Sequence, residues 1–126
     1  MLGELEKEIM DIMWNATKPL TVRVVFELLK KKRKIAYTTA MTVMNRLVEK
    51  KILKRLNEGK AYVYKATYSK DKFLTRTSRQ IIRSFISSFG ETAIAHFVDE
   101  VDKIPKERRG KLLKMLKGAD DPDAKI

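Results

Sequence analysis

The residues whose types and spacing indicate the clearest chemistry lie in the segment from Tyr37 to Lys50. At about 100° per residue, one side of this segment is a narrow apolar stripe and the opposite side is short and polar. Thr and Asn are poorer helix formers than the Lys and Glu that usually fill an exposed helical face, so the polar side lowers helix stability. The apolar stripe consists of Ala40, Val43, Met44 and Leu47. The opposite side carries Thr38, Thr42, Asn45 and Glu49, flanked by Thr39, Met41 and Arg46.

A helix with this polar side fits one particular task. Short side chains that both donate and accept hydrogen bonds let a helix approach base edges in the major groove of duplex DNA, which is about 12 Å wide. Taken alone, the segment is equally compatible with an ordinary amphipathic helix, so the surrounding sequence must decide between the two interpretations.

Positive charge is concentrated around this segment. The chain of 126 residues has a formal net charge of +12. Residues 1–70 hold 16 Lys and Arg against 7 Asp and Glu, a net +9, whereas residues 71–126 contribute only +3. A positive field raises the local concentration of polyanions, although it also serves solubility. The basic run from Lys30 to Lys34 suits the negative end of a helix dipole and, beside a duplex, would also contact phosphates.

The composition argues against several other classes of protein. The chain has no cysteine and a single histidine, His96, so we expect no thiol chemistry, no Ser–His–Asp set and no metal site. Its five glycines form no phosphate-binding loop, and we predict neither enzymatic activity nor a cofactor. No apolar run approaches the roughly 18 residues of a membrane span, and the acidic N-terminus is unlike a signal peptide. We therefore expect a cytoplasmic protein.

Three helices and a hairpin are predicted in the first part of the chain. Apolar residues at helical spacing indicate the helices, Pro19 separates the first two, and Thr21 is a suitable N-cap. Two helices joined by a short connector are typical of a helix-turn-helix, and a basic hairpin behind them is typical of a wing. The predicted ranges are helices 2–14, 22–31 and 37–50, strands 52–56 and 61–67, and a turn at 57–60. We predict a mainly α fold with a small β-hairpin, a winged helix-turn-helix.

The last third of the chain has more apolar surface than a small monomer can cover. Three further helices are predicted, from Asp71 to Phe89, then after Gly90, and then from Pro105. Their excess apolar face indicates a partner, most simply a second copy of the chain, and a self-contained helical cap is the alternative. The residues expected in this α-helical dimerisation region are Leu74, Ile81, Ile82, Phe85, Ile86, Phe89, Ile94, Phe97, Val98, Val101, Leu112, Leu113 and Leu116. The predicted organisation is a winged-helix domain at 1–70, the dimerisation region at 71–118 and a flexible acidic tail at 119–126.

Three stretches of the sequence resemble the penicillinase-repressor family. The first is the region from Leu2 to Trp14, the second is Ala36–Lys50 with its Tyr-Thr-Thr-x-x-Thr-x-x-x-Arg-Leu pattern, and the third is Glu58–Ala66 with Gly-x-Ala-Tyr-x-Tyr. The resemblance covers most of the chain, from about residue 2 to residue 116. It implies a homodimeric winged-helix repressor that binds a palindromic operator.

The expected contacts with double-stranded DNA fall into two groups. The residues expected at base edges are Thr38, Thr39, Thr42 and Asn45. Those expected at the phosphate backbone or on the wing are Tyr37, Arg46, Lys54, Arg55 and Lys60. The resemblance implies that the three threonines match family positions facing DNA and that Arg46 matches a position near the backbone. The alternative function is a winged helix that docks a protein or an RNA in a larger complex.

Two departures from the family pattern bear on geometry and regulation. Lys51 stands where the family usually has glycine, which a left-handed helix end would favour. Family members in antibiotic resistance are regulated by a protease that cuts an Asn-Phe bond, and the matching place here is His96-Phe97. Copper-responsive members use C-terminal cysteines, and this chain has none. The resemblance therefore implies a regulatory protease as a further partner, with its usual cleavage site altered in this chain.

Overall fold

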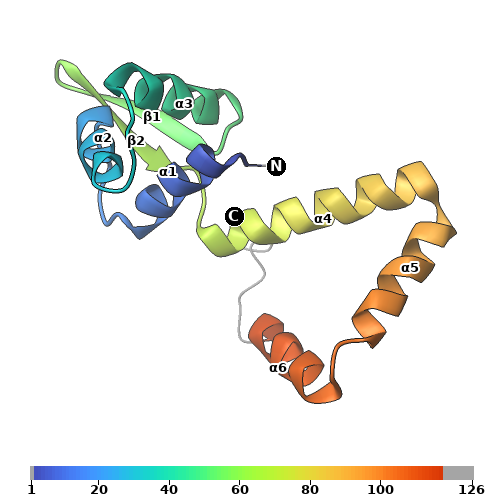
Figure 1. Ribbon diagram of the computed structural model, residues 1–126. Coiled ribbons are helices and arrows are strands. Elements are labelled where there is room, and N and C mark those ends of the chain that lie inside the picture. The colour runs from blue at the N-terminus through green and yellow to red at the C-terminus, as the bar shows by residue number, and fades with distance from the viewer. Residues whose placement is uncertain (1, 118–126) are drawn as a thin grey trace. The chain divides into compact units, whose positions relative to one another are not determined.

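The computed structural model describes residues 2–117, and in this part of the chain it contains six helices and one two-stranded sheet (Figure 1). The elements in chain order are α1 (Glu4–Asn15), α2 (Val22–Lys30), α3 (Tyr37–Glu49), β1 (Leu53–Glu58), β2 (Ala61–Ala66), α4 (Lys70–Phe89), α5 (Glu91–Asp102) and α6 (Lys106–Lys117). Three helices followed by an antiparallel hairpin confirm the predicted mainly α winged helix-turn-helix. The chain divides into two compact units between Phe73 and Leu74, so the first turn of α4 belongs to the winged helix. The acidic tail predicted at 119–126 lies outside the described residues.

The core of the first unit is built from the apolar sides of α1, α2 and α3. The predicted stripe on α3 is entirely buried, and the hydroxyl of Thr21 accepts a hydrogen bond from the Val24 N–H at 3.2 Å, as expected of the cap of α2. Burial of these side chains stabilises the three-helix arrangement at about 25 cal/mol per Å² of apolar surface removed from water. The largest fully buried side chains are Ile9, Met10, Val25, Leu29, Met44, Leu47 and Leu53.

Helix α3 ends in a left-handed residue that is not glycine. Lys51 has φ of 64°, and its N–H donates to the carbonyl of Val48 at 2.9 Å, while the Ile52 N–H donates to the carbonyl of Leu47 at 3.0 Å. This pair of bonds is a Schellman motif, and the buried side chains of Leu47 and Ile52 supply its usual apolar contact. The chain therefore keeps the helix end that a glycine would favour, although lysine stands in its place.

The first strand of the hairpin reaches two residues further toward the turn than the sequence predicted. Asn57 and Glu58 were expected in the turn, but they pair with Tyr62 and Ala61 as the last residues of the ladder. The turn therefore has two residues, and Gly59 at its first position has φ of 66°, which suits a type II′ turn. The prediction of a four-residue turn was wrong because polar side chains on an exposed hairpin do not mark the end of backbone pairing.

The hairpin is also tied to the segment before α2. Leu20 and Tyr64 exchange two backbone hydrogen bonds, at 2.9 Å and 2.7 Å, so Leu20 adds an isolated bridge to the free edge of β2. A two-stranded hairpin is marginal alone, and this bridge fixes the base of the wing to the helices.

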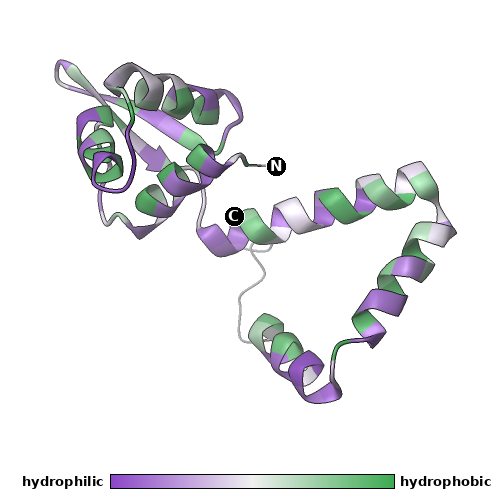
Figure 2. Ribbon diagram, viewed as in Figure 1, coloured by the Kyte–Doolittle hydropathy of each residue, from purple (hydrophilic) through white to green (hydrophobic). Residues whose placement is uncertain are grey.

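The second unit has little core of its own. Among the described residues from Leu74 to Leu116, only Ala93 is buried. Hydrophobic positions recur along α4, α5 and α6 in Figure 2. Of the residues predicted to form the dimerisation region, all but the half-buried Val101 are exposed large hydrophobic residues in the single chain. Within residues 2–117, no helix combines the length and the apolar content that crossing a membrane requires.

Candidate nucleic-acid interface

The outward side of α3 presents short polar groups to solvent. Thr38, Thr39 and Thr42 are exposed, together with Arg46 near the end of the helix. Tyr37 is half-buried at the first position of the helix, where its ring meets the ring of Phe26 edge-on at 5.6 Å between centroids. This hydroxyl-bearing surface is not covered by any other element of the first unit.

Asn45 differs from the threonines because its side chain already has partners inside the protein. Its Oδ1 accepts hydrogen bonds from the Tyr64 hydroxyl at 2.9 Å and from a guanidinium nitrogen of Arg55 at 3.2 Å. Asn45 is half-buried, and Tyr64 is only 2% exposed. The sequence placed Asn45 with the base-contacting residues, and the structure adds this internal link between α3 and the hairpin.

The basic residues of the hairpin lie on different faces. Arg55 and Lys54 are consecutive, so their side chains point to opposite faces of the two-stranded sheet. The Arg55 guanidinium stacks over the ring of Tyr62 at 4.5 Å from its centroid. Lys60 is exposed at the second position of the turn. The structure therefore brings Arg55 to α3, whereas Lys60 stands at the tip of the wing.

The sequence analysis did not identify one basic residue that lies beside α3. The Arg23 guanidinium, on the first turn of α2, lies over the ring of Tyr37 at 4.5 Å and forms an ion pair with Glu27 at 3.7 Å. Cation–π stacking orients a guanidinium while leaving its N–H groups at the edge available for hydrogen bonds. The signal that could have found Arg23 is its position three residues before Phe26, on the same helical face as an aromatic ring.

An ion pair between a buried carboxylate and an exposed ammonium links the start of α1 to the end of α3. Glu6 is 8% exposed, and its carboxylate accepts from the Lys50 ammonium at 2.8 Å and from the Gly3 N–H at 3.0 Å. Burial alone would raise the pKa of Glu6, but the bonds from Lys50 and Gly3 and the positive charges of Lys50 and Arg46 outweigh it. The pKa of Glu6 therefore lies below its ordinary value of 4.5.

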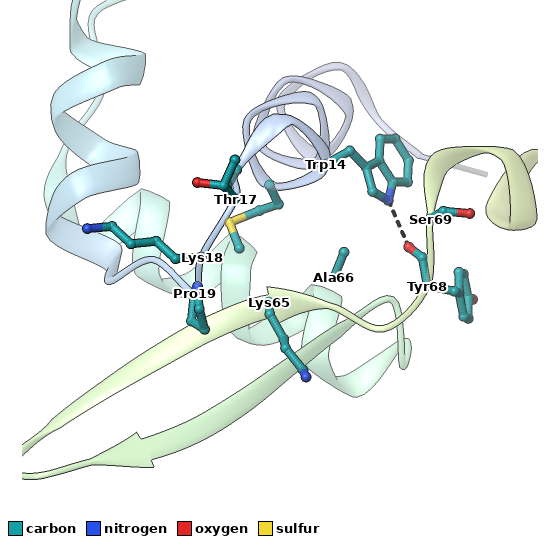
Figure 3. A pocket seen from close by; sticks show the side chains of 10 residues that line it. Trp14, Thr17, Lys18, Pro19, Lys65, Ala66, Tyr68 and Ser69 are labelled. Atoms are coloured by element: carbon teal, nitrogen blue, oxygen red, sulfur yellow. Dashed lines mark hydrogen bonds between the residues drawn. The ribbon is translucent and has the colours of Figure 1, made fainter.

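Trp14 fastens the first helix to the segment that leads into α4. Its indole N–H donates to the carbonyl of Tyr68 at 3.2 Å, as Figure 3 shows, and its ring lies 5.1 Å from that of Phe73. A hollow of about 440 Å³ opens beside these residues, with Lys18 and Lys65 also in its lining. Trp14 therefore anchors the end of α1 to the residues that follow β2.

Comparison of the sequence with known proteins identifies a family and two relatives. The family model described as penicillinase repressor matches residues 2–118. The chain is 35% identical over 101 residues to the transcriptional regulator BlaI of two Mycobacterium tuberculosis strains, CDC 1551 / Oshkosh and ATCC 25618 / H37Rv, which covers 79% of this chain and 73% of each relative.

Two solved structures also resemble it. One is the solution structure of monomeric Bacillus licheniformis BlaI in complex with the blaP half-operator, with a TM-score of 0.49, 24% identity, and coverage of 56% of this chain and 85% of that one. The other is a variant of Lactococcus lactis ZitR, with a TM-score of 0.47, 12% identity, and coverage of 94% and 73%. The family match spans nearly the whole chain, and the chain belongs to the penicillinase repressor family, whose members are transcriptional regulators and not enzymes.

Proposed function

We propose that the protein is a homodimeric, cytoplasmic DNA-binding repressor that places two copies of α3 in the major groove of a palindromic operator. The observation that carries this proposal is the exposed hydroxyl-bearing side of α3, which lies in the more basic part of the chain. Successive half-sites on one side of a duplex are about 34 Å apart, and a two-fold dimer can contact both.

The proposed contacts divide into specific and non-specific ones. Thr38, Thr39 and Thr42 meet base edges, where hydroxyl groups donate to or accept from several bases. Positively charged groups neutralise phosphates and set the salt dependence of binding. The residues proposed for phosphate contacts are Arg23, Arg46, Lys54, Arg55 and Lys60, with Tyr37 at the start of the helix.

The exposed apolar surface of α4, α5 and α6 supports the homodimeric part of the proposal. A monomer that exposes residues such as Phe85 (49%) and Phe89 (65%) leaves a large apolar surface in water, and an identical chain offers the same surface in return. A regulatory protease remains a predicted further partner. Phe97 is 54% exposed in the single chain, but histidine precedes it in place of the asparagine of the usual cleavage bond.

The experiment that tests DNA reading compares two substitutions of different kinds. Binding sites are first selected from random duplexes by the wild-type protein, and affinities for the selected and random DNA are then measured at several salt concentrations. Thr42→Ala should reduce the ratio of selected to random affinity, because it removes a base contact. Lys60→Ala should weaken both about equally and flatten the slope of log K against log salt by about one unit.

Each outcome decides between the two classes of function. An unchanged ratio for Thr42→Ala would contradict the assignment of α3 as the reading helix. Shallow salt dependence with no enriched sequence would favour the alternative, a winged helix that docks a protein or an RNA.

A further inference from the structure

We propose that Asn45 is a positioning residue, which locks the wing to α3 so that Arg55 meets a phosphate in a fixed orientation. The proposal rests on the DNA-binding function above and assigns to Asn45 a role other than base contact. It is carried by three side chains that meet where the hairpin crosses α3: Asn45, Arg55 and Tyr64.

The strand register brings the two hairpin residues together. Arg55 and Tyr64 are directly opposite each other in the β1–β2 ladder. The N–H and C=O of Tyr64 both bond to Leu20, so Arg55 and Tyr64 form a non-hydrogen-bonded pair, the type in which facing side chains lie closest. Both side chains then reach the same atom of Asn45 on α3.

The chemistry of Arg55 fixes which way the Asn45 amide points. A guanidinium has only donors, so the Asn45 atom that faces it must be the oxygen. That oxygen has two lone pairs, and Tyr64 and Arg55 account for both. A bidentate contact with adenine would need the same oxygen as an acceptor. While both hydrogen bonds to its oxygen are formed, Asn45 therefore cannot make the bidentate contact with adenine that asparagine often makes in the major groove.

Two contacts orient the side chain of Arg55, a hydrogen bond and a stacking contact. One guanidinium nitrogen donates to Asn45, and the plane of the group stacks over Tyr62, the diagonal neighbour of Arg55 in the ladder. The bond to Asn45 uses one of five N–H donors, which leaves the guanidinium able to bind a phosphate. An arginine that is already oriented loses less side-chain entropy on binding than one that is free.

Tyr64 provides a selective test because it is 2% exposed and its side chain cannot be part of the surface that meets DNA. Tyr64→Phe removes the hydroxyl that donates to Asn45 and changes no charge. We expect it to weaken binding to selected duplex roughly two- to tenfold, the effect of one neutral hydrogen bond, while the preferred sequence stays the same. We also expect the salt slope to flatten toward that of Arg55→Ala, by up to about one unit, because Arg55 is held less well at its phosphate.

Tyr68→Phe is the matched control, since it makes the same chemical change at another tyrosine. Tyr68 lies between β2 and α4, beside Trp14. Its salt slope should equal that of the wild type. Asn45→Ala should flatten the slope as Tyr64→Phe does. The double variant should flatten it no further, because both substitutions remove the same hydrogen bond between α3 and the hairpin.

Three results would overturn the proposal. One is a wild-type salt slope in Tyr64→Phe with full thermal stability. Another is a change in the preferred base when Asn45→Ala is selected on random duplexes, which would make Asn45 a base-contacting residue. Wild-type protein that binds duplex without salt dependence would refute the proposed function, and this inference with it.

Discussion

Among single residues, Glu6 couples protonation to the stability of the winged helix. Its carboxylate is buried against Lys50, and its pKa is lowered in the folded protein. A group whose folded pKa is depressed contributes stability above its unfolded pKa, near 4.5, and that contribution is lost as the pH falls through the folded value. Acid should therefore loosen the link between the start of α1 and the end of α3.

We expect Glu6→Gln to lower the free energy of unfolding by about 1–2 kcal/mol at pH 7, because Lys50 loses a charged hydrogen-bond acceptor. The difference from wild type should begin to shrink below about pH 4.5, where the carboxylate of the unfolded chain takes up a proton, and should be lost as the pH falls through the lower pKa of the folded protein. Urea unfolding followed by the fluorescence of Trp14, the single tryptophan, measures both quantities. Glu4→Gln is the control, since the Glu4 side chain is 85% exposed and its removal should have a much smaller effect at pH 7. A difference that grows on acidification would contradict the argument.

Single residues were predicted best where their role follows from helical periodicity. The buried stripe on α3 and the threonine cap of α2 could be predicted because each depends on positions within one helix. The partners of Asn45 could not, because Arg55 and Tyr64 are 10 and 19 residues away and reach it only when the hairpin folds over α3. The same holds for Glu6, whose partner Lys50 lies 44 residues further along the chain.

At the scale of elements, the end of α3 stores backbone strain. Lys51 adopts φ of 64°, a conformation that costs roughly 1 kcal/mol for a residue with a Cβ and little for glycine. The two bonds of the Schellman motif and the buried pair of Leu47 and Ile52 hold it there. The sequence shows only that lysine replaces the family's usual glycine here, and the surrounding contacts decide the backbone conformation.

We expect Lys51→Gly to raise the free energy of unfolding by about 0.5–1 kcal/mol, because relief of strain exceeds the extra entropy that glycine gives the unfolded chain. Lys31→Gly is the matched control: Lys31 is the C-cap of α2 with φ of −69°, where glycine only adds unfolded-state entropy. Denaturation of the two variants without DNA separates the effects. Equal destabilisation by both would show that the conformation of Lys51 carries no strain.

At the scale of the whole molecule, the two units differ in how far their own buried core determines their architecture. Residues up to Phe73 bury a continuous core from three helices and the hairpin, so their architecture could be predicted from periodicity and turn chemistry. The helices after Leu74 bury only Ala93 among the described residues, so their sequence pattern predicts helices but not how those helices pack. We expect their packing to be determined by contacts with a partner, which we propose is a second copy of the chain.

Dimerisation can be tested with one charge on that surface. Phe85 is 49% exposed in the single chain and packs against Phe89 at 5.2 Å between ring centroids, so a glutamate at position 85 would have to be buried unpaired in a dimer. We expect Phe85→Glu to sediment as a monomer at tens of micromolar, a concentration at which we expect the wild type to be a dimer. Leu28→Glu places the same charge on an exposed apolar residue of α2, 38% exposed, and should remain dimeric.

The consequence for DNA follows from linkage of the two reading helices. A dimer that binds one half-site presents its second α3 at a high effective concentration to the other, so affinity for a full palindrome exceeds that for a half-site by far more than twofold. Phe85→Glu should lose about 100-fold or more on the palindrome and little on the half-site, which mobility shifts on the two duplexes measure. Equal losses on both would mean that the substitution damages the winged helix itself. A wild type that stays monomeric at these concentrations would show that α4, α5 and α6 serve another partner.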